Sequence, residues 1–99
     1  MYKNLINQKV IARSYDAGVF YGVLAGFDGN VAHLTNVRQL WYWSGAASLM
    51  KLANEGVQNP DNCKFTVAVS EVVISRVCEI LPTSEKAQQI IEAVREWRS

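Results

Sequence analysis

The 99-residue sequence has few of the residues that build metal sites, disulfide frameworks or membrane segments. Its only histidine and two cysteines, His33, Cys63 and Cys78, are too few for a zinc site or a disulfide framework, so we expect two reduced thiols and no bound metal. No run reaches the roughly 18 to 20 apolar residues of a membrane-spanning helix. The first apolar run is also too short for a signal peptide. These absences predict a cytoplasmic protein that does not contact a membrane.

An excess of charge of one sign is lacking as well. Ten Lys and Arg residues oppose nine Asp and Glu residues, which leaves a formal net charge of +1. Bulk binding to double-stranded nucleic acid or to an anionic membrane depends on a long basic field, and this chain has none. Any anion that it binds must therefore be held by a few local groups.

Groups for catalysis are scarce. His33 belongs to a His-x-Thr triplet of the kind found in two-histidine phosphodiesterases, but those enzymes need two such triplets and this chain has one. A strand histidine that packs or bonds locally is the commoner case. Asp16 and Asp28 are explained by turns, and no glycine-rich nucleotide loop is present. We expect no catalytic residues, no cofactor and no enzymatic activity.

What the sequence does contain is enough apolar material for a folded core. Hydrophobic residues make up 49% of the chain and aromatic residues 10%, and one core typically serves about 100 to 150 residues. We expect residues 1–99 to form a single domain. A domain of this size leaves part of its apolar surface uncovered, which favours a homo-oligomer.

The first half of the chain reads as β structure. A β-branched run spans residues 9–15, and alternating side chains follow over residues 19–27. The pair Asp28-Gly29 is typical of a type I′ turn, so residues 30–40 should return antiparallel. Gly22 and Gly26 predict sharp curvature of the strand that contains them. Two more β-branched runs cover residues 64–69 and 72–80, with Ser70-Glu71 between them.

Helical patterns follow the β-rich half. A helix of about three turns is expected after Trp43, with Ser44 as its N-cap and Gly56 at its end. Pro82 precedes a last helix, whose apolar positions at helical spacing are Ala87, Ile90, Ile91, Val94 and Trp97. The sequence thus predicts an α+β fold, a small, strongly curved antiparallel or barrel-like sheet of about five strands with one short internal helix and a C-terminal helix.

The segment NVRQLWYWSGAASL, residues 36–49, is the best candidate for a binding site. Arg38 offers a fork of donors to phosphate, and Trp41, Tyr42 or Trp43 could stack on a purine. Small residues at the expected helix start, including Ala46 and Ser48, would let a ligand approach free N–H groups. The alternative is structural, with Trp41 and Trp43 as core anchors and Arg38 as an ordinary surface residue.

A second candidate segment, residues 13–19, carries Arg13 and Tyr15 before a tight turn that ends at Gly18. The turn could expose backbone donors to an anion, although Tyr15 could equally be a packed residue at a strand end. If the sheet brought the two segments together, Arg13 and Arg38 would bracket one anion.

These stretches, RSYDAGVFYG (residues 13–22) and NVRQLWYWSGAASL, resemble a family of short, uncharacterised proteins of tailed bacteriophages and prophages. The resemblance extends over nearly the whole chain and includes Cys63-Lys-Phe65, Glu79-Ile80 and Trp97. It implies a phage protein made in the host bacterial cytoplasm. Small oligomeric phage proteins without catalytic groups include the anti-defence sponges, which sequester nucleotide signals of bacterial immunity.

The resulting first hypothesis is a phage anti-defence protein that binds and sequesters, without catalysis, a cyclic oligonucleotide or a cyclic ADP-ribose type of signal. The expected ligand-binding residues are Arg13, Tyr15, Gly18, Arg38, Trp41, Trp43, Ala46 and Ser48. The rival hypothesis is a small β-barrel module that binds a host protein or single-stranded nucleic acid. A minor structural or assembly protein of the virion is a third possibility.

Overall fold

The computed structural model describes residues 2–46 and 48–97 and shows an α+β fold, as the sequence predicts. Its sheet has six strands instead of about five. In chain order the elements are η1 (Tyr2–Leu5), β1 (Lys9–Ser14), β2 (Gly18–Asp28), β3 (Val31–Tyr42), α1 (Leu49–Glu55), η2 (Pro60–Asn62), β4 (Lys64–Phe65), β5 (Val69–Ile74), β6 (Val77–Pro82) and α2 (Glu85–Ala93).

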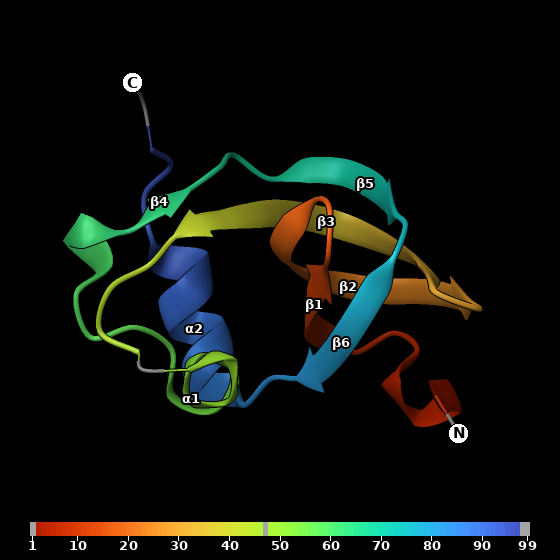
Figure 1. Ribbon diagram of the computed structural model, residues 1–99. Helices are drawn as coiled ribbons and strands as arrows, with labels where there is room; N and C mark the ends of the chain where they lie inside the picture. The colour runs from red at the N-terminus through yellow and green to blue at the C-terminus, as the bar shows by residue number, and fades with distance from the viewer. Residues whose placement is uncertain (1, 47, 98–99) are drawn as a thin grey trace.

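The strands form one antiparallel sheet in the order β4-β3-β2-β1-β6. Strand β5 pairs with the first half of β3, on the same edge on which β4 pairs with the second half. Strands β5 and β6 are joined by only two residues, yet they pair with β3 and β1, which lie on opposite sides of β2. This connection requires a sheet that curls strongly without closing, and Figure 1 shows β5 and β6 wrapped around β1 to β3.

The expected hairpin forms between β2 and β3, with a small shift of its turn. Asp28 pairs with Val31, so the turn residues are Gly29 and Asn30. Gly29 takes the positive φ, at 61°, whereas Asn30 does not, so the turn is not the expected type I′.

Glycine and two bulges produce the curvature. Thr35 pairs with Val23 and Arg38 pairs with Tyr21, so two residues of β3 oppose Gly22 alone. A Cβ at Gly22 would lie 3.0 Å from the Thr35 carbonyl oxygen, which shows how closely the strands approach there. A second irregularity lies in β2 before Gly26. The two glycines that predict curvature therefore sit where the sheet bends.

The sheet is covered on both faces and builds two cores. The core inside the curl consists of Val10, Ala12, Phe20, Leu24, Ala32, Leu34, Val37, Ile74 and Val77. The core between the sheet and the two helices consists of Ile11, Tyr21, Leu40, Leu52, Ala53, Val57, Cys63, Phe65, Leu81, Ala87, Ile91 and Val94. Adjacent strand residues such as Val10 and Ile11 enter different cores, because successive side chains of a strand point to opposite faces. Figure 1 shows the helices at one end of the sheet.

The internal helix is shorter than predicted, and its N-cap is Ser48, not Ser44. The Ser48 hydroxyl accepts a hydrogen bond from the Lys51 N–H at 3.2 Å. The chain cannot be helical at Gly45, whose φ is 89° and where a Cβ would lie 2.6 Å from the backbone nitrogen of Gln58. The predicted end at Gly56 is confirmed, while Ala47 lies outside the described residues.

The C-terminal helix is also shorter than its apolar stripe implied. Ser84 caps α2, and the helix ends at Ala93, so the prediction that Trp97 belongs to it is wrong. Beyond Val94 the chain extends along β4, where Glu96 bridges to Phe65 and the Trp97 N–H donates to the Phe65 carbonyl at 2.9 Å. This pairing gives the Trp97 N–H a hydrogen-bond partner that a further turn of α2 would otherwise have had to supply.

The predicted break at Ser70-Glu71 is wrong, because both residues lie within β5. The chain instead turns at Ser75-Arg76, where Arg76 has a φ of 55°. No helix in residues 2–46 and 48–97 is long and apolar enough to cross a membrane.

Candidate functional site

A groove of about 1150 Å³ opens between the sheet, the end of α2 and the two segments on either side of β4. Its floor comes from β1 to β3 and one wall from the end of α2 and the residues that follow. The lining residues are Lys9, Tyr21, Gly22, Val23, Asn36, Arg38, Pro60, Asp61, Cys63, Val67, Ala68, Glu92, Arg95, Glu96 and Trp97.

The bulge at Asn36 determines what the groove floor contains. Asn36 has a φ of 53°, in the left-handed region that asparagine tolerates better than most residues. Its extra residue puts Val37 into the core inside the curl and turns Arg38 to the helix side. The local backbone of β3 thus places an arginine beneath the end of α2.

Arg38 is almost completely buried and is bonded to backbone carbonyls. Its Nε donates to the Thr66 oxygen at 2.9 Å, and its Nη1 donates to the Ile91 and Val94 oxygens at 3.0 and 2.8 Å. The guanidinium also lies 5.4 Å from the centre of the Phe65 ring. Burial lowers the Arg38 pKa, and the charge of Glu96 partly opposes this. Arg38 therefore anchors the C-terminal end of α2 to the sheet while it lines the groove.

Glu92 is the centre of a second polar cluster in the groove. Its Oε2 atom accepts a short hydrogen bond from the Tyr21 hydroxyl and lies 2.8 Å from Lys9 Nζ. Partial burial acts to raise the pKa of Glu92, but the bonds from Lys9 and Tyr21 outweigh it and lower that pKa. Burial and Glu92 together raise the pKa of Tyr21. The cluster presents an ionised carboxylate beside a neutral phenol.

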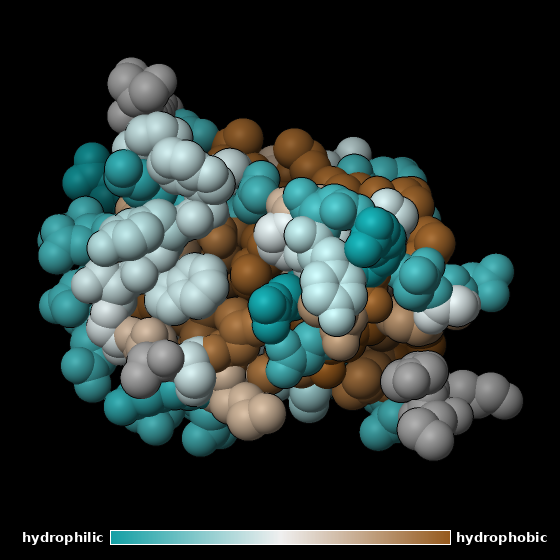
Figure 2. All heavy atoms as spheres, in the orientation of Figure 1, coloured by the Kyte–Doolittle hydropathy of each residue, from teal (hydrophilic) through white to brown (hydrophobic). Residues whose placement is uncertain are grey.

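Beside the groove lies an exposed cluster of Trp41, Tyr42, Trp97 and Lys64, which we call the aromatic patch. Trp41 and Trp97 stack with ring centres 5.0 Å apart and an angle of 24° between the planes. Lys64 Nζ lies 5.1 to 5.9 Å from the centres of all three rings. Figure 2 shows large pale side chains gathered over β4 and the end of β3, near the C-terminus. Trp97 belongs to the patch and also lines the groove, so the two are continuous.

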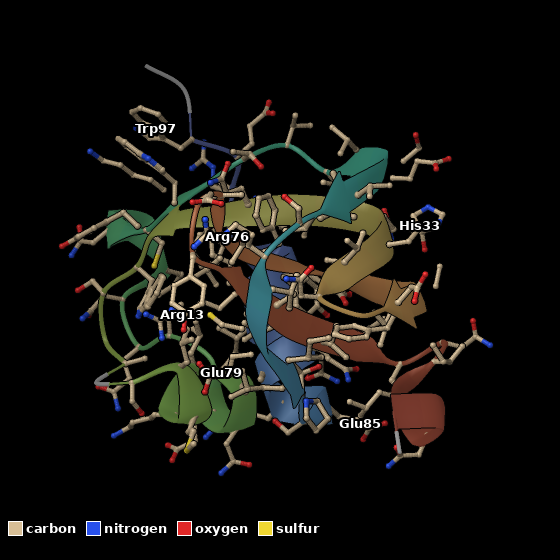
Figure 3. All side chains as sticks on the ribbon, turned by 45° about the vertical axis from the view of Figure 1, so that its right-hand side comes forward. Arg13, His33, Arg76, Glu79, Glu85 and Trp97 are labelled. Carbon is tan, nitrogen blue, oxygen red and sulfur yellow. The ribbon has the colours of Figure 1, made fainter. Side chains whose placement is uncertain are left out.

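The second candidate segment lies away from this site. Arg13 pairs with Glu79 across β1 and β6, at 3.6 Å, and does not line the groove. Tyr15 is 71% exposed and lies under the guanidinium of Arg76, 5.7 Å from its ring centre. Gly18 begins β2 with a φ of 99°. Figure 3 shows Arg13 and Arg76 close to β6 and well separated from Trp97. Arg38 lines the groove and donates to backbone carbonyls, whereas Arg13 lies outside the groove, so Arg13 and Arg38 do not bracket one anion.

Three other predicted residues support α1 and its approach. Trp43 and Ala46 are half-buried and pack against the core between sheet and helices. The Ser48 hydroxyl is the N-cap of α1 and accepts a hydrogen bond from the Lys51 N–H. Of the eight predicted site residues, Arg38 lines the groove. Trp41 stacks on Trp97, which lines the groove, and the other six lie elsewhere.

Several groove residues were missed by sequence reasoning. Glu92 belongs to the polar side of a helical pattern, and Tyr21 belongs to an alternating strand. Neither pattern marks its residue as part of a binding site. Trp97 was predicted to belong to the apolar stripe of the last helix. One signal in the sequence could have identified Trp97: a helix that ends near Val94 leaves this tryptophan outside the helix and free to line another surface.

The groove offers binding groups more than reactive ones. Burial raises the pKa of the Cys63 thiol, so it stays protonated, and its single S–H has the Asn59 and Ser44 carbonyl oxygens as acceptors at 3.5 and 3.9 Å from the sulfur. Within residues 2–46 and 48–97, no group of three His, Cys, Asp or Glu side chains could hold a metal ion. The groove combines stacking surface, cations and carboxylates.

Comparison with known proteins places the chain in a family. The model of a domain of unknown function (DUF6948) matches residues 7–91. The chain belongs to this family. The match spans β1 to β6 and α2 as far as Ile91, so it includes the sheet floor of the groove and ends one residue before Glu92. No curated protein and no solved structure matches the chain significantly.

Proposed function

We propose that this member of the DUF6948 family is a phage anti-defence protein that binds and sequesters a nucleotide-type signal in the host cytoplasm, without catalysis. The ligand class is a cyclic oligonucleotide or a cyclic ADP-ribose type of molecule. The observation that carries the proposal is the position of Trp97, which lines the groove and forms half of an exposed tryptophan stack beside Lys64. A ring face and a cation at the rim of a groove suit a nucleobase with its phosphate.

The size of the groove supports a ligand larger than one nucleotide. Pockets for small molecules commonly measure about 300 to 1,000 Å³, and this groove reaches about 1150 Å³. It is open on one side, and a second copy of the chain could cover it. We therefore include a homo-oligomer in the proposal, which light scattering coupled to size-exclusion chromatography would test.

The charges of the groove are compatible with a small number of phosphates. Lys9 is paired with Glu92, and Arg38 with backbone carbonyls. Arg95 lines the groove and Lys64 lies at its rim, and neither forms an ion pair within the described part of the chain. These two cations support binding of a ligand with one or a few phosphates better than binding of a long polyanion.

Calorimetry against cyclic dinucleotides, cyclic trinucleotides and cyclic ADP-ribose isomers tests the proposal. We expect stoichiometric binding to at least one of them, and no change in the mass of the released ligand. Replacing Trp97 by alanine should weaken binding about 10- to 100-fold, the usual effect of losing one base-stacking ring. Met50→Ala is a suitable control, because Met50 is exposed on α1 and does not line the groove. Binding to none of these compounds would overturn the proposal.

A second candidate function is binding of single-stranded nucleic acid on the aromatic patch. It is favoured by the exposure of Trp41 and Tyr42, which are 57% and 52% accessible and lie outside the groove. Successive bases could stack there while Lys64 contacts the backbone. A salt titration separates the two functions, because single-strand binding weakens steeply with ionic strength and a small ligand in a groove responds much less.

A further inference from the structure

We propose that Glu92 makes the groove selective for ribosyl over 2′-deoxyribosyl ligands by accepting a hydrogen bond from a ribose hydroxyl. This inference rests on the nucleotide function proposed above, and it adds that the groove recognises the sugar of the nucleotide. It also explains why a site for an anionic ligand contains a carboxylate at all.

The Glu92 carboxylate is held in place through only one of its two oxygen atoms. Lys9 from β1 and Tyr21 from β2 both contact Oε2. Within residues 2–46 and 48–97, Oε1 has no donor, although a carboxylate offers about four acceptor positions. The Glu92 side chain is 44% exposed and lines the groove, so a ligand can reach it.

This arrangement is preorganised for an incoming donor. Two bonds from two different strands hold the side chain, so little rotational freedom remains to be lost when a ligand binds. Tyr21 is itself buried in the core between sheet and helices, which makes the support rigid. The free acceptor therefore points to a ligand group with an O–H or N–H, at a position set by the sheet.

The chemistry of the carboxylate narrows the class of that group. An ionised carboxylate accepts hydrogen bonds and donates none, and it repels phosphate. The groups of a nucleotide that present a donor without negative charge are the sugar hydroxyls and the base N–H groups. A base that stacks on Trp97 is held by its face at the rim, and the sugar attached to that base then extends into the groove that Glu92 lines. This arrangement favours a ribose hydroxyl as the donor, and carboxylates are common partners of ribose hydroxyls in nucleotide sites.

The test is calorimetry with three matched ligand pairs, which are cyclic diadenylate, cyclic triadenylate and cyclic ADP-ribose, each beside its 2′-deoxy analogue. For a pair that binds, we expect the ribosyl form to bind about 10- to 100-fold more tightly, the range that one charge-assisted hydrogen bond supports. Glu92→Leu should abolish this preference, which is a ratio of two affinities and therefore does not depend on a change that affects both forms equally. Glu92→Gln, which preserves the shape, should reduce the preference partly.

Glu85→Gln is the matched control, since Glu85 lies in the first turn of α2 and does not line the groove. Figure 3 shows it far from Trp97. Thermal melting of each variant checks that the fold is retained. Equal binding of ribosyl and deoxyribosyl forms by the wild type, or an equal loss of both in Glu92→Gln, overturns this inference and leaves the nucleotide function standing. Binding of none of the six compounds overturns both.

Discussion

Both halves of β3 carry polar side chains among apolar ones, but the polar side chains of the two halves lie in different environments. In the first half, His33 is exposed on the outer surface and bonds Glu71 of β5 at 3.0 Å. In the second half, Arg38 is buried beneath the end of α2 and donates to three carbonyls. The halves are separated by the single bulge at Asn36. His33 and Arg38 both point away from the core inside the curl, so the difference shows that the bulge keeps Arg38 on this face and that the end of α2 covers the face at Arg38.

The alternation of the strand explains how this happens. Ala32 and Leu34 point into the curl, and after the bulge Val37 takes that direction. If Asn36 occupied a regular strand position instead of the bulge, Val37 and Arg38 would exchange faces, because the side-chain period of a strand is two. An arginine would then enter an apolar core, and the end of α2 would lose its anchor.

The largest expected effect is that of Arg38→Leu, which we predict to destabilise the fold by about 2 to 4 kcal/mol. The change leaves the carbonyls of Thr66, Ile91 and Val94 without their donor. Urea unfolding followed by tryptophan fluorescence measures it. The matched change in the first half, His33→Leu, should shift the free energy of unfolding by no more than about 0.5 kcal/mol, because its partner is exposed. Similar losses for the two variants would remove the distinction between the halves.

The second prediction concerns the bulge itself. Asn36→Val should cost about 1 to 2 kcal/mol, because a β-branched residue is strained at a φ of 53°. Asn36→Gly should be nearly neutral in stability, since glycine adopts this conformation readily. Paired urea denaturation curves measure both changes. If valine were tolerated as well as glycine, the bulge would not depend on the left-handed conformation of residue 36.

The smallest effect is a pH dependence of stability that comes from Glu92, the carboxylate beside the second half of β3 in the groove. The pKa of Glu92 is lowered in the folded protein, so its stabilisation is present above the unfolded pKa of about 4.3 and is lost as the pH falls through the lower folded value. Because the side chain is partly exposed, we expect less than about 1 kcal/mol. The difference in unfolding free energy between wild type and Glu92→Gln should therefore shrink from pH 6 to pH 3. Stability curves of the two proteins that stay parallel over that range would contradict this.

Much of the fold could be predicted from local pattern. Alternating side chains and a turn pair identified the hairpin, and Gly22 and Gly26 marked its curvature. The stop at Gly56 was also correct. Helix starts were less accurate, since Ser44 and Ser48 are equivalent as caps in sequence, and a tertiary contact between Gly45 and Gln58 decides between them. The end of α2 was missed for a similar reason, because pairing with β4 competes with a further helical turn.

The sequence by itself determined the class of the fold, the curvature of its central hairpin and the segment that contributes Arg38 and Trp41, because period, glycine and turn chemistry act over a few residues. Only the tertiary structure decided the composition of the groove. Glu92, Tyr21 and Lys9 come from three elements far apart in the chain, and Trp41 meets Trp97 across a distance of 56 residues in sequence. Such contacts depend on how the sheet curls and where α2 ends, which no local pattern encodes.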